Sequence, residues 1–191
     1  MPAFFMNYNT IQMKFKILTA PGFGGSEPQH WQSIWEKENP DYKRIEQRTW
    51  FQPVCSEWVQ TIENEINNSH GNVVIIAHSL ACIALMHLSI HSKYLIKGAL
   101  LVAPPDVERY DFPKQIKGFA PIPLSKLPFK SILIASTNDQ YTSIERAEQF
   151  AKAWGSEFVN IGNKGHINLA SNLGSWEEGK IIFQKLFLEI I

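Results

Sequence analysis

The stretch Val73-Val74-Ile75-Ile76-Ala77-His78-Ser79-Leu80-Ala81-Cys82-Ile83 decides the fold of this chain. It opens with four consecutive β-branched apolar residues, a run typical of a strand that is buried on both faces of a parallel sheet. From Leu80 to Leu88 only His87 is polar, which predicts a buried helix. No loop composition separates the two, so the strand turns into the helix within about two or three residues. Ser79 lies at this turn.

A serine at such a turn indicates a nucleophile elbow, which presents one hydroxyl above the carboxyl ends of the strands. The usual pattern is Gly-x-Ser-x-Gly, because small residues on either side of the serine let strand and helix pack closely. Here Ala77 and Ala81 hold the two small positions. The alternative is that Ser79 is an ordinary N-cap, a position that serine often takes. The elbow interpretation therefore requires a base, an acid and an oxyanion hole elsewhere in the chain.

Length and charge restrict the class of protein. The chain has 191 residues, enough for one domain with a substantial core. Lysine plus arginine and aspartate plus glutamate both number 18, so nothing favours nucleic acid or an anionic membrane as a partner. No window approaches the roughly 18 continuous apolar residues that span a bilayer. No particular protein partner is indicated either.

The N-terminal end and the cysteines bear on location. Residues 1–13 are interpreted as an extension that is not packed on the domain, and residues 14–191 as the folded domain. Met1 to Gln12 make a poor signal peptide, because no basic residue precedes their few apolar ones. Cys55 and Cys82 fall in different predicted helices and do not make a disulfide framework. These features favour a cytoplasmic location.

Strands and helices alternate along the rest of the chain. Besides the strand that opens at Val73, strands are predicted at 14–20, 98–103, 131–135 and 157–161, with a polar sheet-edge strand at 44–47. Helices are predicted at 56–68, after Ser79, and behind the capping boxes Ser26-x-x-Gln29, Thr142-x-x-Glu145 and Ser175-x-x-Glu178. This alternation predicts a single-domain α/β fold with a mostly parallel sheet of about six strands.

The segment from Pro104 to Lys130 interrupts this pattern. It holds six of the eleven prolines, interleaved with Phe112, Phe119 and Phe129. A connection of this length in a compact α/β domain is usually functional. We expect it to form one wall of the pocket, with a single helical turn near Val107 to Tyr110, and to set the length of acyl chain that the pocket accepts.

Three residues with complementary chemistry each follow a predicted strand. Ser79, Asp139 and His166 come after the third, fifth and sixth strands, and the carboxyl ends of parallel strands share one edge of the sheet. A serine hydroxyl needs a base, and the imidazole needs a carboxylate that holds its tautomer and stabilises the imidazolium. The sequence therefore predicts Ser79 as nucleophile, His166 as base and Asp139 as the orienting acid.

Alternatives exist for these assignments. Asp139 could be a turn residue and His166 a solvated loop residue, and Asp106, after the fourth strand, is the rival acid. Asp139 is preferred because its loop is compact and nearer to the histidine loop in sheet order. His87 and His91 have the spacing of metal ligands, but no third ligand cluster accompanies them, so no metal is predicted.

The first predicted strand runs into the glycine-rich loop Pro21-Gly22-Phe23-Gly24-Gly25-Ser26. A phosphate cradle is one interpretation, but the chain has neither a Gly-Lys-Ser/Thr ending nor a Gly-x-Gly-x-x-Gly pattern there. The other interpretation is the oxyanion loop of a hydrolase. Its donors would be the backbone N–H groups of Leu80 and of Gly22-Phe23-Gly24, above all Phe23. His30 either lines the same pocket or belongs to the core.

Four motifs together resemble a known family. They are Pro21-Gly22-x-x-x-Ser26-x-x-x-His30-Trp31, Ala77-His78-Ser79-Leu80-Ala81, Asn138-Asp139-x-Tyr141 and Gly165-His166-Ile167-Asn168. They resemble the small serine hydrolases related to retinoblastoma-binding protein nine and the bacterial YdeN-like proteins, over nearly the whole chain from Lys14. The resemblance implies an α/β-hydrolase core without a large cap domain, and a triad that maps onto Ser79, Asp139 and His166. It supports the reaction type far better than the substrate.

The expected activity is hydrolysis of small carboxylic esters or thioesters through an acyl-enzyme, without a cofactor or metal. The alternative is a binding or scaffold protein with a vestigial hydrolase site, since a fold does not fix a function. An amidase or peptidase would need a pocket for a leaving amine, which nothing in the sequence indicates. Covalent labelling of Ser79 separates the first two possibilities.

Overall fold

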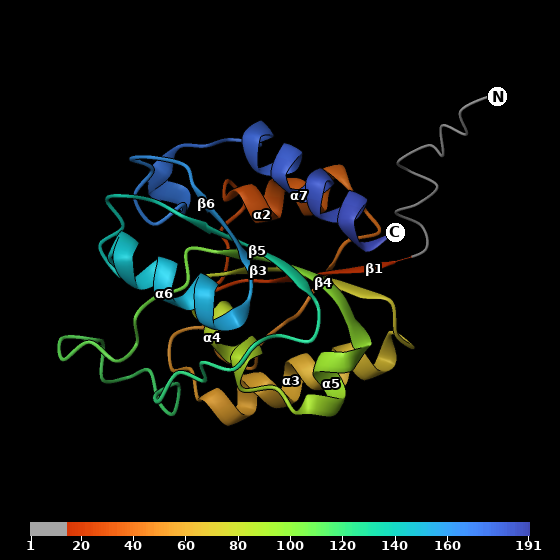
Figure 1. Cartoon of the computed structure of the whole chain (residues 1–191), viewed down its shortest axis with the longest axis horizontal. Coiled ribbons are helices and arrows are strands. Elements are labelled where there is room, and N and C mark those ends of the chain that lie inside the picture. Colours follow the sequence, from red (N-terminus) through yellow and green to blue (C-terminus); the bar gives the residue numbers. More distant parts are fainter. Residues whose placement is uncertain (1–14) are drawn as a thin grey trace.

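A six-stranded parallel sheet forms the centre of the molecule (Figure 1). The structure is a computed structural model that describes residues 15–191, so the extension predicted at 1–13 lies outside the described residues. The strand order is β2-β1-β3-β4-β5-β6. The strands are β1 (Lys16–Ala20), β2 (Lys43–Arg44), β3 (Val73–His78), β4 (Ile96–Val102), β5 (Lys130–Ala135) and β6 (Glu157–Asn160). The predicted parallel α/β fold is confirmed.

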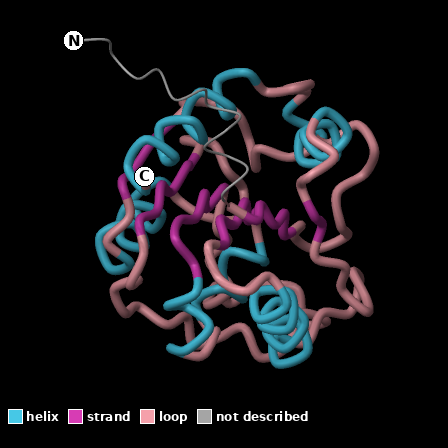
Figure 2. Tube along the Cα trace, turned by 90° about the vertical axis from the view of Figure 1, so that its right-hand side faces the viewer, coloured by secondary structure: helices cyan, strands magenta, loops and turns pink. Residues whose placement is uncertain are grey.

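Helices cover both faces of this sheet (Figures 1 and 2). One face carries α2 (Trp31–Glu38) and α7 (Glu177–Ile190), and the other carries α3 (Cys55–Asn68), α4 (Leu80–Met86), α5 (Ile90–Leu95) and α6 (Ile144–Trp154). A short 3-10 helix, η1 (Leu169–Ser171), precedes α7. Ile75 and Ala77 of β3 pack toward α3 and α4, whereas Val74 and Ile76 pack toward α2 and α7. Because side chains alternate along a strand, both sets must be apolar, which explains the run that opens at Val73.

The start of α2 differs from the prediction. The helix begins at Trp31, and its N-cap is His30 rather than Ser26. The Ser26 hydroxyl donates instead to the side-chain carbonyl of Gln32, 2.8 Å away in the protein interior. Four residues therefore separate Ser26 from the first residue of the helix, and the capping box predicted at Ser26 is wrong.

The caps of α6 and α7 also lie one residue beyond their predicted positions. α6 is capped by Ser143, because the hydroxyl of Thr142 donates to the buried carbonyl of Pro104 (2.6 Å). α7 begins at Glu177, and its N-cap is Trp176 rather than Ser175. Trp176 has a left-handed backbone with a φ of 46°, so the chain turns at this residue before it enters the helix. In both cases a tertiary contact or backbone turn overrides the local motif.

The two histidines with metal-like spacing serve other purposes. α4 ends at Met86, two residues before the predicted end at Leu88. Nε2 of His87 is 3.0 Å from the Phe119 carbonyl, and His91 is exposed on α5. Within residues 15–191 no three histidine, cysteine, aspartate or glutamate side chains are grouped to hold a metal ion. Within the same residues no helix has the length and apolar character needed to cross a bilayer.

Residues 104–129, here called the wall segment, connect β4 to β5 without regular secondary structure. Near Val107 to Tyr110, where one helical turn is predicted, the structure has a single hydrogen-bonded turn, in which the Arg109 N–H donates to the Asp106 carbonyl (3.3 Å), and no longer helix. The Asp106 carboxylate accepts the Glu108 N–H (3.2 Å), which stabilises a tight turn in place of a helix. The segment is nevertheless fixed to the domain, because Phe119 and other apolar side chains of the segment are buried in the core.

Candidate active site

Three loops at the carboxyl edge of the sheet bring Ser79, Asp139 and His166 together. The Ser79 hydroxyl lies 2.8 Å from Nε2 of His166. Nδ1 of His166 lies 2.8 and 3.0 Å from the two carboxylate oxygens of Asp139. Because a carboxylate only accepts hydrogen bonds, Nδ1 carries the ring proton and Nε2 is free to accept from the serine. The three side chains form one continuous hydrogen-bond chain.

Ser79 has the backbone of a strained turn. Its φ is 54° and its ψ is −125°, values that non-glycine residues rarely adopt. Its side chain makes no capping hydrogen bond to α4, although it precedes the helix. The neighbouring loop is tightly packed against it, since a Cβ on Gly22 would lie 2.7 Å from the Ser79 Cβ. The strained geometry and the His166 contact fit an elbow better than an ordinary N-cap.

Asp139 and its rival Asp106 have different partners. Asp139 also accepts the backbone N–H of Tyr141 (2.8 Å), and its side chain is only 3% exposed. The Asp106 carboxylate lies 3.4 Å from the Arg146 guanidinium on α6. Of the two carboxylates, only Asp139 contacts His166.

Asn138, which the sequence places in a motif with Asp139 without assigning it a role, joins the acid loop to the histidine loop. Its side-chain carbonyl accepts the N–H of Gly165 (2.7 Å) and the hydroxyl of Ser136 (3.0 Å). Ser136 in turn accepts the N–H of Lys164 (2.9 Å). These bonds fix the separation between the carboxylate and the imidazole.

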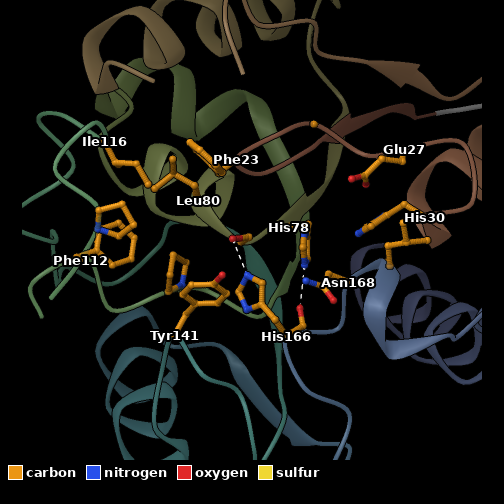
Figure 3. Close-up of a pocket in the computed structure, with 15 residues that line it drawn as sticks. Phe23, Glu27, His30, His78, Leu80, Phe112, Ile116, Tyr141, His166 and Asn168 are labelled. Carbon is orange, nitrogen blue, oxygen red and sulfur yellow. Dashed lines mark hydrogen bonds between the residues drawn. The ribbon is translucent and has the colours of Figure 1, made fainter. Parts of the chain in front are cut away.

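A cavity of about 200 Å³ opens beside Ser79. It is lined on one side by apolar residues that include Leu80, Phe112 and Ile116, and on the other by Glu27, His30 and Asn168 (Figure 3). Such a cavity is somewhat smaller than typical sites for drug-sized ligands, which hold roughly 300–1,000 Å³. The arrangement can place a small acyl carbonyl next to an activated hydroxyl.

A family model described as serine hydrolase matches residues 17–185. The chain belongs to the serine hydrolase family. A solved structure described as that of a YdeN-like hydrolase from Pectobacterium atrosepticum is 32% identical, with a TM-score of 0.84 and 96% of each chain covered. The predicted resemblance and enzyme class are thereby confirmed.

More distant structures share the fold of this hydrolase. The ydeN gene product of B. subtilis is 18% identical with a TM-score of 0.70, over 91% of this chain and 98% of that one. Est1E from Butyrivibrio proteoclasticus is 13% identical with a TM-score of 0.67, over 91% and 86%. No curated protein matches the chain.

Two backbone N–H groups beside Ser79, those of Leu80 and Phe23, are available as hydrogen-bond donors to a ligand of this hydrolase. Neither the N–H of Leu80 nor that of Phe23 donates to any residue within 15–191. Both residues line the cavity. Gly24 is different, because its N–H donates to the Trp50 carbonyl (3.0 Å) and is not available to a ligand. Gly22 contributes by its lack of a side chain, which lets the loop approach Ser79.

Gln32 anchors the glycine-rich loop, a role that sequence reasoning missed. The side chain is fully buried, and its NH₂ group donates to the carbonyls of Ile76 (3.1 Å) and Ala20 (3.4 Å), near the ends of β3 and β1. Its carbonyl accepts the Ser26 hydroxyl. One amide thus ties the loop to the two strands that carry the site. The sequence around Gln32 gives no signal of this role, because its partners lie in β1 and β3.

His78 and His30 pack behind the reacting groups. Nε2 of His78 donates to the backbone carbonyl of His166 (3.1 Å), which positions the loop that carries the base. Burial lowers the pKa of His78 well below its usual value, and that of His30 to about 4, with smaller contributions from nearby positive charge. Both rings are therefore neutral at pH 7. The structure places His30 in the pocket lining and also at the N-cap of α2.

Proposed function

We propose that this serine hydrolase cleaves small carboxylic esters or thioesters with short apolar acyl groups, through a triad of Ser79, His166 and Asp139. The observation that carries the proposal is the hydrogen-bond chain through these three side chains at the edge of an open cavity. The chemistry needs no group beyond the side chains and backbone described here.

Acylation begins with proton transfer from Ser79. As Oγ bonds to the acyl carbonyl carbon, Nε2 of His166 takes the hydroxyl proton, and Asp139 stabilises the imidazolium. The carbonyl oxygen becomes an oxyanion that accepts hydrogen bonds from the backbone N–H groups of Leu80 and Phe23. The bond to the leaving oxygen or sulfur then breaks, and that atom takes the proton from His166. The products of this step are acyl-Ser79 and an alcohol or thiol.

Deacylation repeats these transfers with water. His166 takes a proton from the water as its oxygen bonds to the acyl carbon. The bond to Ser79 Oγ then breaks, Oγ recovers the proton from His166, and a carboxylic acid leaves. The same oxyanion donors serve both half-reactions, so each step balances with water as the only co-reactant.

The apolar side of the cavity supports a short acyl group. Leu80, Phe112, Pro113 and Ile116 surround this space, and the cavity as a whole holds about 200 Å³. We expect kcat/KM for 4-nitrophenyl esters to be highest for short chains, such as acetyl to butyryl, and to fall for long ones. Matched esters and thioesters in the same panel separate the two substrate classes.

The experiment that tests the proposal is intact-mass spectrometry after treatment with a fluorophosphonate. We expect one covalent adduct on the wild-type protein and none on Ser79→Ala. Ser156→Ala removes a hydroxyl next to Ser131, at the amino end of β6 and therefore at the edge of the sheet opposite the site. It serves as the matched control and should retain the adduct. Circular dichroism of all three proteins checks that they are folded.

An unlabelled, folded wild-type protein would contradict the proposed triad mechanism. That outcome would favour the alternative of a binding protein with a vestigial site, and protein pull-downs would then be the next measurement. An adduct that persists on Ser79→Ala would assign the nucleophile to a different residue.

A further inference from the structure

The cavity beside Ser79 has two chemically different sides (Figure 3). Phe112 and Ile116 of the wall segment lie on one side together with Leu80, and Glu27, His30 and Asn168 lie on the opposite side. The Ser79–His166 hydrogen bond lies between them. An ester bound with its carbonyl at Ser79 therefore extends one portion into an apolar space and the other into a polar one. The polar side has no role in the triad chemistry itself.

His30 is built as a fixed hydrogen-bond donor toward the polar side. Its Nδ1 accepts the backbone N–H of Gln32 (3.2 Å), so the neutral ring carries its proton on Nε2. No residue within 15–191 accepts a hydrogen bond from that Nε2–H, and His30 lines the cavity. Histidine is an uncommon N-cap compared with Ser, Thr, Asp or Asn. Ser, Thr or Asp would serve as the cap of α2 equally well but would bring no side-chain N–H to the cavity.

Glu27 and Asn168 complete a set of donors and acceptors. The Glu27 carboxylate makes no hydrogen bond or ion pair with any residue of the described chain. The side-chain carbonyl of Asn168 accepts the Ala170 N–H (3.1 Å), so its NH₂ group is left to face the cavity. A ligand group here meets a carboxylate acceptor, an imidazole N–H donor and an amide donor.

We propose that this polar side binds a hydroxyl group on the alcohol portion of the ester substrate, through Glu27, His30 and Asn168. The inference rests on the proposed function. A hydroxyl both donates and accepts, so it can donate to Glu27 and accept from His30. An ammonium group cannot accept the His30 N–H, and a carboxylate would be repelled by Glu27. The substrate class is then an ester of a short acid with a polyhydric alcohol.

The assignment to the alcohol portion follows from the position of the base. The leaving oxygen must accept its proton from Nε2 of His166. Asn168 follows His166 by two residues on the same loop and lines the polar side. The alcohol that departs next to His166 is therefore the portion that reaches Asn168, and the acyl chain occupies the side formed by the wall segment.

Three butyrate esters test this inference. We would measure kcat/KM for 1-butyrylglycerol, for propyl butyrate, which has the same carbon skeleton without the hydroxyls, and for 4-nitrophenyl butyrate. We expect the wild-type enzyme to prefer 1-butyrylglycerol over propyl butyrate by about 10- to 100-fold, as two hydrogen bonds that include a charged partner predict. Propyl 3-hydroxybutyrate, with its hydroxyl on the acyl portion, should show no such gain.

Two variants remove the proposed partners. Glu27→Leu removes the acceptor, and His30→Asn removes the Nε2–H while retaining a good N-cap. Each should reduce the ratio of the two kcat/KM values to within about threefold. The ratio is used because it does not depend on the fraction of active protein. Glu148→Leu removes an exposed carboxylate from α6, outside the cavity lining, and should keep the wild-type ratio.

The outcomes separate this inference from the proposed function. Hydrolysis of 4-nitrophenyl butyrate without preference for 1-butyrylglycerol overturns the hydroxyl site and leaves the esterase proposal standing. A preference that survives in Glu27→Leu and His30→Asn overturns the assignment to these residues. A gain with propyl 3-hydroxybutyrate instead overturns the assignment to the alcohol portion. Failure to hydrolyse any of the esters overturns the esterase proposal itself.

Discussion

Three histidine rings pack together behind Ser79, yet only His166 contacts its hydroxyl. The His78 ring lies 5.2 Å from that of His166 and 5.0 Å from that of His30, between ring centroids. Burial is the main reason why the pKa values of His78 and His30 are lowered. Because both rings stay neutral, no second imidazolium opposes the positive charge that His166 acquires during proton transfer. The neutral pair thus supports the base electrostatically as well as by packing.

Asp139→Asn tests the acid assignment at the scale of a single residue. The amide cannot stabilise the imidazolium, and it can donate to Nδ1, which favours the wrong tautomer of His166. We expect kcat on a short ester to fall by about 10³- to 10⁴-fold, with a much smaller change in KM. Steady-state kinetics measure this effect. Asp106→Asn is the matched control and should keep kcat within about threefold, since Asp106 pairs with Arg146. Equal losses of kcat in the two variants would contradict the assignment of Asp139, rather than Asp106, as the acid of the triad.

The roles of residues that directly follow a predicted strand could be predicted from the sequence. The roles of residues that bond to partners far along the chain could not. Ser79 and Asp139 each follow an apolar run and His166 follows the short strand β6, so parallel topology alone brings them to one edge of the sheet. Gln32 bonds to a carbonyl 44 positions away, and Asn138 bonds to an N–H 27 positions away. No local pattern in the sequence contains such pairs.

At the scale of elements, the wall segment is held to α6 by Arg146. The guanidinium pairs with Glu108, lies 3.4 Å from the Asp106 carboxylate, and stacks over the Phe150 ring at 4.6 Å. Glu108 also accepts the Ile122 N–H (2.9 Å), which connects the two ends of the apolar wall. These contacts indicate a fixed wall rather than a lid that opens and closes.

Arg146→Met should loosen this wall. The change leaves two half-buried carboxylates without their cation, and we expect the free energy of unfolding to fall by about 1–3 kcal/mol. KM for a short ester should rise more than kcat falls, because the acyl side of the cavity loses its shape while the triad is untouched. Lys152→Met, on the exposed side of the same helix, is the control for loss of one positive charge.

Urea denaturation and limited proteolysis measure the two parts of this prediction. Cleavage of Arg146→Met within residues 104–129, at protease concentrations that leave Lys152→Met intact, would support the fixed wall. Identical stability and identical cleavage in the two variants would show that the ion pairs contribute nothing to it.

The element boundaries show where local motifs fail. The capping box at Thr142 was displaced because its hydroxyl donates to Pro104, 38 positions earlier. The box at Ser26 failed because its hydroxyl belongs to the network of Gln32. The interior of β3, by contrast, was predictable, because its run of β-branched apolar residues indicates a strand buried on both faces, and all six of its residues are buried.

At the scale of the whole molecule, the buried neutral histidines couple folding to pH. His30 has its usual pKa of 6.5 when exposed in the unfolded chain and a pKa of about 4 in the folded protein. Between these values the unfolded state binds a proton that the folded state does not. The free energy of unfolding therefore rises with pH in this window. The contribution of His30 to it is fully present above pH 6.5 and is lost as the pH falls toward 4. His78 acts in the same direction, because its pKa is also lowered.

His30→Asn isolates one of these contributions. The interval from 6.5 to about 4 corresponds to about 3 kcal/mol of stability that depends on His30 staying unprotonated. The variant retains an N-cap but has no titrating ring, so its free energy of unfolding should depend less steeply on pH, by about 1.4 kcal/mol per pH unit. Urea denaturation at several values between pH 4.5 and 7.5 measures the two curves. Their difference should be largest above pH 6.5 and shrink or reverse toward pH 4.5. Parallel curves would show that burial of His30 carries no proton linkage, whatever the absolute stability of the variant.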